Sequence, residues 1–187
     1  MMVSIQNLQR EAPVDAARVT KLARCAIRRL RIRERGTLAI TFIGTRRMQM
    51  LNKRFLHHDR PTDVLSFRYD NAEGRRPKAR IVNGLWPQAS GLRPIIGEIL
   101  IAPQQARAYA ARHKIPYREE LSRYVVHGLL HWLGRRDGTP QEQMVMRKQE
   151  NALLARCGVL SDIRHETSDR RPKLRRRSHV SGLMSQV

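Results

Sequence analysis

The segment ELSRYVVHGLLHWLGRRD, residues 120–137, decides how this chain folds and what it can do. It belongs to a predicted amphipathic helix that ends at Gly134, because glycine is the residue most often found just past a helix end. His127 and His131 are four residues apart and therefore share one face of that helix, one turn apart. Both imidazoles can reach a single metal ion.

A third ligand follows the helix, where Gly134 lets the chain turn back and bring Asp137 to the same ion. The complete pattern is H-x-x-x-H-x-x-G-x-x-D. Two neutral imidazoles and one carboxylate leave an open position for water, as in catalytic zinc sites, where the pKa of bound water falls to about 7. A histidine pair alone is more often packed or simply exposed, but the glycine and the third ligand favour a metal site formed by His127, His131 and Asp137.

The residue after the first histidine disfavours one class of zinc enzyme, the zinc proteases. Zinc proteases with the motif H-E-x-x-H use a glutamate at that position as general base. Here the position is Gly128. The sequence therefore predicts a metalloprotease-like zinc helix that lacks the general base for peptide hydrolysis. Hydrolysis of a peptide is kept only as a minor alternative function.

The same segment resembles the metal-binding helix of the YbeY endoribonucleases, which are rRNA maturation factors. LNKRFLHHDRPTDVLSF (51–67) is similar to that family's second signature, and IIGEILIA (95–102) is similar to its G-D/E-I strand. The resemblance implies a single-strand-specific, zinc-dependent endoribonuclease with one Zn²⁺ per chain and no small-molecule cofactor. It also implies a cytoplasmic role in small-subunit rRNA 3′-end maturation and ribosome quality control, with ribosomal RNA and the small ribosomal subunit as partners.

Three positions depart from the family pattern, the first being Arg136, where the family has an aspartate. The third histidine ligand of the family falls on Asp137, which is a competent zinc ligand. An arginine that the family implicates in activity falls on Leu56, and Arg54 or Arg60 could supply the charge from nearby. The catalytic residues expected from the resemblance are therefore His127, Arg60 and Arg54.

Composition supports a nucleic-acid partner. The 187 residues include 37 Lys and Arg against 16 Asp and Glu, a formal charge of +21. Such a charge attracts polyanions, and basic residues that neutralise phosphates release counterions.

No apolar run approaches the 20 or so residues of a transmembrane helix, and the N-terminus lacks the features of a signal peptide. Cys25 and Cys157 are expected to be ordinary reduced cysteines in an intracellular protein with no membrane partner.

Hydrophobic periodicity predicts an α/β (α+β) domain, in which helices cover a small mixed β-sheet. We expect one catalytic, metal-dependent domain over residues 1–160, interrupted by a long loop at 70–94, and a basic, disordered tail at 161–187. The predicted order is strand 3–8, helix 14–35, strand 37–43, a short helix after Thr45, strands 63–69 and 95–102, and helices 103–113, 116–133 and 139–158.

Three questions stay open from the sequence. The altered ligand and the missing arginine would also suit an RNA- or ribosome-binding assembly factor whose activity is weakened or lost. Glu98, inside an apolar strand, either partners a histidine proton or points to solvent. Asp63 either stabilises the start of a strand, which we favour, or contacts the substrate.

Overall fold

A mixed four-stranded sheet forms the centre of the computed structural model, which describes residues 1–69 and 94–160. The strands are β1 (Met2–Asn7), β2 (Thr37–Phe42), β3 (Val64–Arg68) and β4 (Ile95–Ile101), in the order β1-β2-β4-β3. The first three strands in that order run parallel, and β3 is antiparallel to β4. The predicted mixed sheet covered by helices is therefore confirmed.

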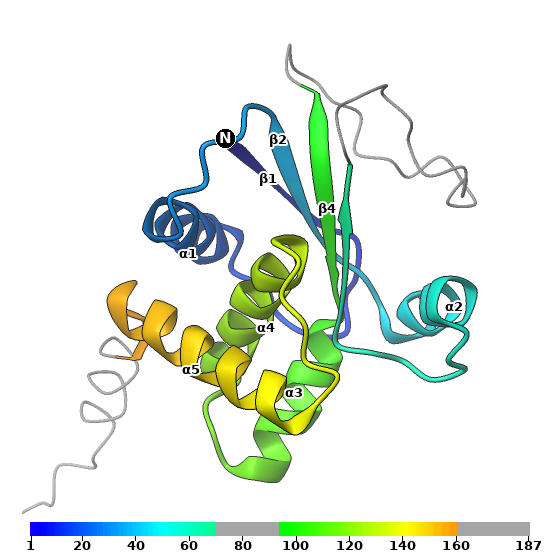
Figure 1. Ribbon diagram of the computed structural model, residues 1–187. Helices are drawn as coiled ribbons and strands as arrows, with labels where there is room; N and C mark the ends of the chain where they lie inside the picture. Colours follow the sequence, from blue (N-terminus) through cyan, green and yellow to red (C-terminus); the bar gives the residue numbers. More distant parts are fainter. Residues whose placement is uncertain (70–93, 161–187) are drawn as a thin grey trace, which may run out of the picture.

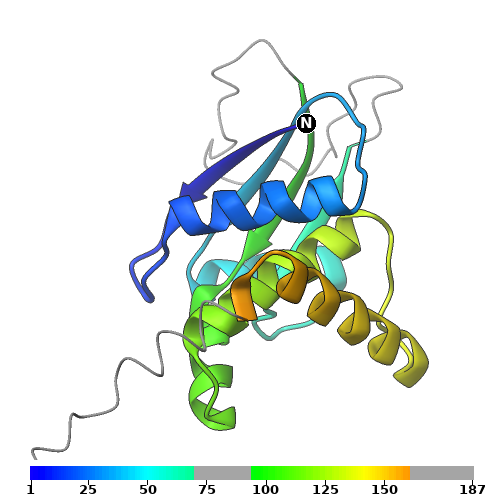
Figure 2. The same cartoon turned by 90° about the vertical axis from the view of Figure 1, so that its left-hand side faces the viewer.

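Within the described residues, five helices pack around the sheet: α1 (Ala16–Arg29), α2 (Thr45–Leu56), α3 (Pro103–His113), α4 (Tyr117–Trp132) and α5 (Pro140–Arg156). Figures 1 and 2 show α1, α4 and α5 on one side of the sheet, with α3 beside α4. On the other side, α2 buries Met48 and Leu51 against Leu65 and Leu100 of the strands. The part of the chain that the structure describes contains no helix with the length and apolar character needed to cross a membrane.

Helix α4 packs against the sheet on the side opposite α2 and also contacts three other helices. Its second half is buried almost all round, with Leu129, Leu130 and Trp132 at most 2% exposed. A helix that is apolar on every side is stable only when neighbours cover it, and α4 contacts α1, α3, α5, β3 and β4. The two histidines of the motif are therefore held on a helix that has neighbours on several sides.

The first predicted helix is shorter than expected. The sequence predicts an apolar face of Leu22, Ala26 and Leu30. The first two are buried, whereas Leu30 is partly buried and is the C-cap residue. The helix nevertheless ends at Arg29 instead of continuing to residue 35, and Arg31 adopts a left-handed conformation with φ 54°. The prediction of the far end was wrong because arginines are good helix formers, so the sequence contains no composition change there.

The last predicted helix begins where the sequence indicates. Thr139 accepts a hydrogen bond from the backbone N–H of Glu142, and the Glu142 carboxylate accepts one from the backbone N–H of Thr139. This reciprocal capping satisfies two backbone donors at the helix start. The predicted long loop (70–94, apart from Pro94) and the predicted tail (161–187) lie outside the described residues.

Cys25 and Cys157 form a disulfide bond, so the expectation of two reduced cysteines was wrong. Cys25 lies on α1 and Cys157 is the C-cap residue of α5. The two residues are 132 positions apart, and only the packing of the helices brings their Cα atoms to 5.9 Å. Sequence spacing carries no information about such a pairing.

The disulfide is expected to stabilise the fold, because it closes a long loop in the unfolded chain. Cys157→Ser should lower the free energy of unfolding by about 2–4 kcal/mol, measured by urea denaturation of the oxidised proteins. Cys25→Ser and the reduced wild-type protein should show the same loss. An identical urea midpoint for the wild-type protein with and without reductant would contradict a stabilising bond.

Candidate metal centre

Three donor atoms meet at the end of α4. His127 Nε2 and His131 Nε2 are 3.0 Å apart, and Asp137 Oδ2 lies 3.7 Å from the first and 3.6 Å from the second. These three residues are the ones that the sequence predicts to share an ion, and their candidate ligand atoms all lie within 4.8 Å of one another. All three residues are partly buried, and His127 and Asp137 line a cavity.

The spacing of the donor atoms fits a tetrahedral metal ion. Ligands about 2.0–2.1 Å from a tetrahedral zinc lie about 3.3 Å from one another. The three observed separations, 3.0, 3.6 and 3.7 Å, bracket that value. Two imidazole nitrogens and a carboxylate oxygen are also an ordinary donor set for catalytic zinc. The cluster can therefore hold such an ion with little adjustment.

A glycine turn brings the third side chain back to the helix. The backbone N–H of Gly134 donates to the carbonyl of His131, and that of Arg135 donates to the carbonyl of Leu130. This pair of hydrogen bonds is a Schellman motif, which requires a left-handed residue at its first position after the helix. Gly134 has φ +82°, a conformation that glycine adopts without strain.

Both histidines are oriented through their other ring nitrogen. His127 Nδ1 lies 2.8 Å from Glu150 Oε1, and His131 Nδ1 lies 2.9 Å from the carbonyl oxygen of Arg135. Both partners accept hydrogen bonds, so each Nδ1 is the donor and each Nε2 keeps its lone pair for a metal. Hydrogen bonds of this kind select the tautomer and hold the ring of a metal-binding histidine.

We call His127, His131 and Asp137 the metal cluster, and Glu150 connects it to a buried ionic network. Its side chain is 5% exposed, and its Oε2 lies 3.2 Å from Arg123 Nη1 and 3.5 Å from Arg147 Nη1. Arg123 Nη1 also donates to Asn151 Oδ1 at 2.7 Å. Two arginines and one histidine therefore share a single carboxylate, which keeps it charged inside the protein.

The pKa values of the pair reflect this arrangement. Burial alone would lower the pKa of His127, but the hydrogen bond to Glu150 and the charges of Asp63, Glu150 and Asp137 outweigh it and raise the pKa above its usual 6.5. Burial alone would raise the pKa of Glu150, but His127, Arg147 and Arg123 outweigh it and lower the pKa below 4.5. Protons therefore compete with a metal at His127 more strongly than at an isolated histidine.

Packing explains the glycine that replaces the protease glutamate. A Cβ atom on Gly128 would lie 2.5 Å from Ile99 Cγ2 and 2.9 Å from Val64 Cγ1. The Gly128 carbonyl also accepts a hydrogen bond from Ser66 Oγ at 2.9 Å. Helix α4 thus approaches the sheet too closely at this position for any side chain, and a general base cannot be placed there.

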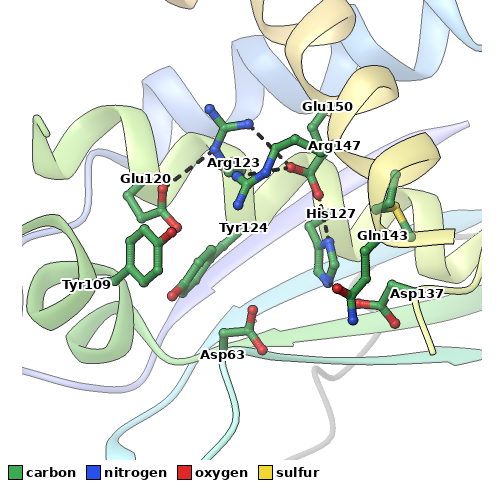
Figure 3. Close-up of a pocket in the computed structure, with 11 residues that line it drawn as sticks. Asp63, Tyr109, Glu120, Arg123, Tyr124, His127, Asp137, Gln143, Arg147 and Glu150 are labelled. Carbon is green, nitrogen blue, oxygen red and sulfur yellow. Dashed lines mark hydrogen bonds and ion pairs between the residues drawn. The ribbon is translucent and has the colours of Figure 1, made fainter. Parts of the chain in front are cut away.

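A cavity of about 290 Å³ opens beside the cluster (Figure 3). His127 and Asp137 form one end of it. The remaining wall residues come from the start of β3 and from α3, α4 and α5: Asp63, Tyr109, Glu120, Arg123, Tyr124, Gln143, Met146, Arg147 and Glu150. Of the two wall arginines, Arg147 is the more exposed, since its side chain is 51% exposed and that of Arg123 is 11% exposed.

The arginines predicted as catalytic do not line this cavity. Arg54 is on α2 with its guanidinium 6.0 Å from the Phe55 ring, and Arg60 follows α2 and its carbonyl accepts a hydrogen bond from Asn52. Leu56, at the family arginine position, is the last residue of α2 and is 51% exposed.

The structure answers one of the two open questions about carboxylates, the one about Glu98. Glu98 is 2% exposed and accepts hydrogen bonds from Thr41 Oγ1 at 3.4 Å and Tyr69 Oη at 3.3 Å, so it neither partners a histidine nor points to solvent. Asp63 accepts a hydrogen bond from Thr62 Oγ1 just before β3, and its side chain lines the cavity, so contact with a substrate stays a prediction.

Sequence reasoning missed Glu150, Arg123 and Arg147. A signal for the first was present, because Met146, Glu150 and Leu154 repeat every four residues and are the buried face of α5. A charged residue inside an apolar stripe is normally paired. Its partners His127 and Arg123 could not be named, since they lie on another helix, α4.

Comparisons with known proteins identify the family of this chain. A family model described as Endoribonuclease YbeY matches residues 4–158. Endoribonuclease YbeY of Brevibacillus brevis is 31% identical over 160 residues, covering 84% of this chain and 99% of that protein. The protein of the same name from Geobacillus kaustophilus is 34% identical over 122 residues, covering 65% of this chain and 73% of that protein.

A solved structure shares the fold. The solution structure of TM1509 from Thermotoga maritima matches with a TM-score of 0.52 and 18% sequence identity, covering 94% of this chain and all of that chain. At this identity the likeness concerns the fold alone. The family match covers most of the chain, including all three residues of the metal cluster, and so the chain belongs to the YbeY endoribonuclease family.

Proposed function

We propose that the protein is a zinc-dependent endoribonuclease that cuts single-stranded RNA. The proposal rests mainly on one observation: His127 Nε2, His131 Nε2 and Asp137 Oδ2 lie within 3.7 Å of one another. In addition, the Nδ1 atom of each histidine has a hydrogen-bond acceptor that orients the ring. Family membership supports RNA as the substrate, and so does a formal charge of +21.

The chain's own residues have three tasks in this reaction. His127, His131 and Asp137 would hold the ion, which when bound supplies a Lewis acid and lowers the pKa of a water molecule. Glu150 orients His127 and keeps its proton on Nδ1. Arg147, half exposed at the cavity wall, is placed to bind the scissile phosphate and to stabilise its developing negative charge.

Arg54 and Arg60 would then act outside the cavity. Arg60 is three residues before Asp63, a wall residue, on the segment that leads from α2 to β3. We propose that both arginines bind phosphates on either side of the cleavage site, where each charge adds to affinity and to its salt dependence. His127 keeps its proposed role as a catalytic residue, through the metal.

The resemblance also suggests the biological setting. We propose that residues 1–160 form a single metal-dependent domain acting in the cytoplasm on ribosomal RNA of the small subunit, in 3′-end maturation and ribosome quality control. Support comes from the family match over residues 4–158 and from the basic charge.

A second candidate function is RNA binding without cleavage. Leu56 at the family arginine position and Asp137 at the third histidine position favour it. A protein of this kind would bind ribosomal RNA or small subunits with a steep salt dependence and would cut nothing with any metal. The wall position of Arg147 favours the enzyme, because it supplies a positive charge that Leu56 lacks.

The deciding experiment measures metal content and cleavage in the same preparation. The full-length protein should contain about one zinc per chain, cut labelled single-stranded RNA and spare the matching duplex. A chelator should abolish cleavage and added zinc should restore it. Mass analysis of the product ends identifies the nucleophile, because attack by the RNA 2′-hydroxyl leaves a cyclic phosphate and attack by water does not. Chelator-resistant cleavage would overturn the metal mechanism.

The role of Arg147 is tested by comparing three substitutions. Arg147→Met should lower kcat by about a hundredfold, the loss typical of one group that stabilises developing charge, without removing zinc. Arg54→Met and Arg60→Met should mainly raise KM and reduce the salt dependence of RNA binding. A larger loss of kcat in either of these than in Arg147→Met would instead assign the catalytic arginine to the segment around α2.

A further inference from the structure

The cavity extends well beyond the metal cluster, into a region that metal binding does not explain. Figure 3 shows Tyr109, Glu120 and Tyr124 grouped at the end away from His127, with Asp63 between. We call these four residues, Asp63, Tyr109, Glu120 and Tyr124, the tyrosine pocket. The whole cavity, at about 290 Å³, is near the lower end of small-molecule sites, which span about 300–1,000 Å³. It suits a ligand of the size of one nucleotide.

Glu120 has a buried carboxylate oxygen without a hydrogen bond. The residue is 3% exposed, and within residues 1–69 and 94–160 no donor makes a hydrogen bond to its Oε2. The nearest cation is Arg123, whose Nε lies 3.5 Å away as an ion pair. Buried acceptors are nearly always satisfied. An orphaned carboxylate oxygen at the wall of a cavity therefore indicates a ligand that donates a hydrogen bond.

The other groups in the tyrosine pocket are aromatic rings and acceptors. Tyr109, on α3, has one ring face against His113 with the ring centroids 4.0 Å apart. Burial and the nearby charge of Asp63 raise the pKa of Tyr124, so its phenol stays protonated and can donate a hydrogen bond. Asp63 and Glu120 repel a phosphate at this end, whereas planar rings and carboxylates suit a nucleobase.

We propose that the tyrosine pocket binds one unpaired nucleobase of the RNA, with Glu120 accepting a hydrogen bond from an exocyclic amino group of that base. This inference rests on the proposed function, which places the neighbouring phosphate at the metal cluster. Adenine, cytosine and guanine carry such an amino group. Uracil presents a single N–H between two carbonyl oxygens, which the carboxylate repels. The pocket therefore selects against uracil next to the cleavage site.

Binding of mononucleotides tests the proposal without requiring cleavage. The four nucleoside 5′-monophosphates are titrated into the full-length protein, with and without zinc, and followed by NMR chemical shifts. The adenine, cytosine and guanine compounds should bind about tenfold more tightly than the uracil compound, the contribution of one hydrogen bond to a charged acceptor. Shifts should concentrate at Tyr109 and Tyr124.

Two matched variants assign the selectivity to one residue. Glu120→Gln removes the charge and adds an amide N–H that can donate a hydrogen bond to a uracil carbonyl. The preference for the other three bases over uracil should therefore fall to about twofold or less. Glu119→Gln is the control, because Glu119 pairs with the same arginine, 3.4 Å from Arg123 Nη2, yet is absent from the cavity wall. It should keep the full preference. Circular dichroism checks that both variants are folded.

The possible failures are distinguishable. Equal binding of the four mononucleotides, no binding of any of them, or equal effects of the two substitutions would each overturn the base pocket. RNA cleavage measured on the same preparations reports the proposed function separately. If the protein cuts RNA but binds the four bases equally, the proposed nuclease function stands and the base pocket is refuted. If it discriminates among the bases but never cuts RNA, the base pocket stands and the nuclease function is refuted.

Discussion

His131→Ala is expected to abolish stoichiometric zinc binding and to lower RNA cleavage by at least about a thousandfold. Loss of an outer-shell partner already costs metal sites about 10–100-fold, and His131 supplies one of only three protein donor atoms in the described cluster. The substitution also removes the imidazole that faces His127 at 3.0 Å. Metal analysis after dialysis and a cleavage assay on single-stranded RNA measure both effects.

A suitable control for this variant is His58→Ala. His58 is exposed in the segment after α2 and lies outside the cluster. It should keep both zinc and activity, so the loss in His131→Ala cannot be assigned to the removal of any histidine. His131→Ala protein that still cuts RNA at the wild-type rate would refute the metal mechanism.

Glu150→Ala is expected to damage stability and metal binding together. Removing one partner of a buried ion pair typically costs 3–5 kcal/mol. Because Arg123 retains Glu119 at 3.4 Å and Glu120 at 3.5 Å, we expect the lower end, about 3 kcal/mol. Zinc affinity should also fall by about 10–100-fold, since His127 loses the acceptor of its Nδ1 proton. Urea denaturation and competition with a metal chelator measure the two losses.

Glu150→Gln separates charge from hydrogen bonding, because glutamine keeps an acceptor oxygen for His127. It should retain more zinc affinity than the alanine variant. In the metal-free protein, the raised pKa of His127 contributes stability that is complete below 6.5 and is lost as pH rises through the folded value. The lowered pKa of Glu150 contributes stability above 4.5 that is lost in acid.

The stability difference between wild type and Glu150→Gln should therefore be largest between pH 4.5 and 6.5 and should shrink at higher pH. Zinc affinity should show the opposite trend and increase with pH, because the ion requires a neutral His127. A stability difference that does not change with pH would contradict the charged pairing of these two residues.

Local patterns were sufficient for much of the fold. The period of four on α4, the capping residues Thr139 and Glu142 and the β-branched strand 37–43 depend on neighbours in sequence, and the structure confirms the corresponding elements. The end of α1 was not predictable in this way, because nothing in the local composition distinguishes Arg29 from the arginines that follow it. The order of the strands could not be predicted either, since β2 pairs with β4 and not with β3, which follows β2 in the sequence.

For the candidate site, the sequence by itself determined the three residues of the metal cluster. His127 and His131 share a helix face, and Gly134 returns Asp137 to that face within a few residues, so helix geometry and one turn are enough. The tertiary structure alone decided what surrounds them. Glu150, the tyrosine pocket and the disulfide partner Cys157 come from segments separated in sequence, and the free energy that joins such segments comes from packing of the whole core, which no local pattern encodes.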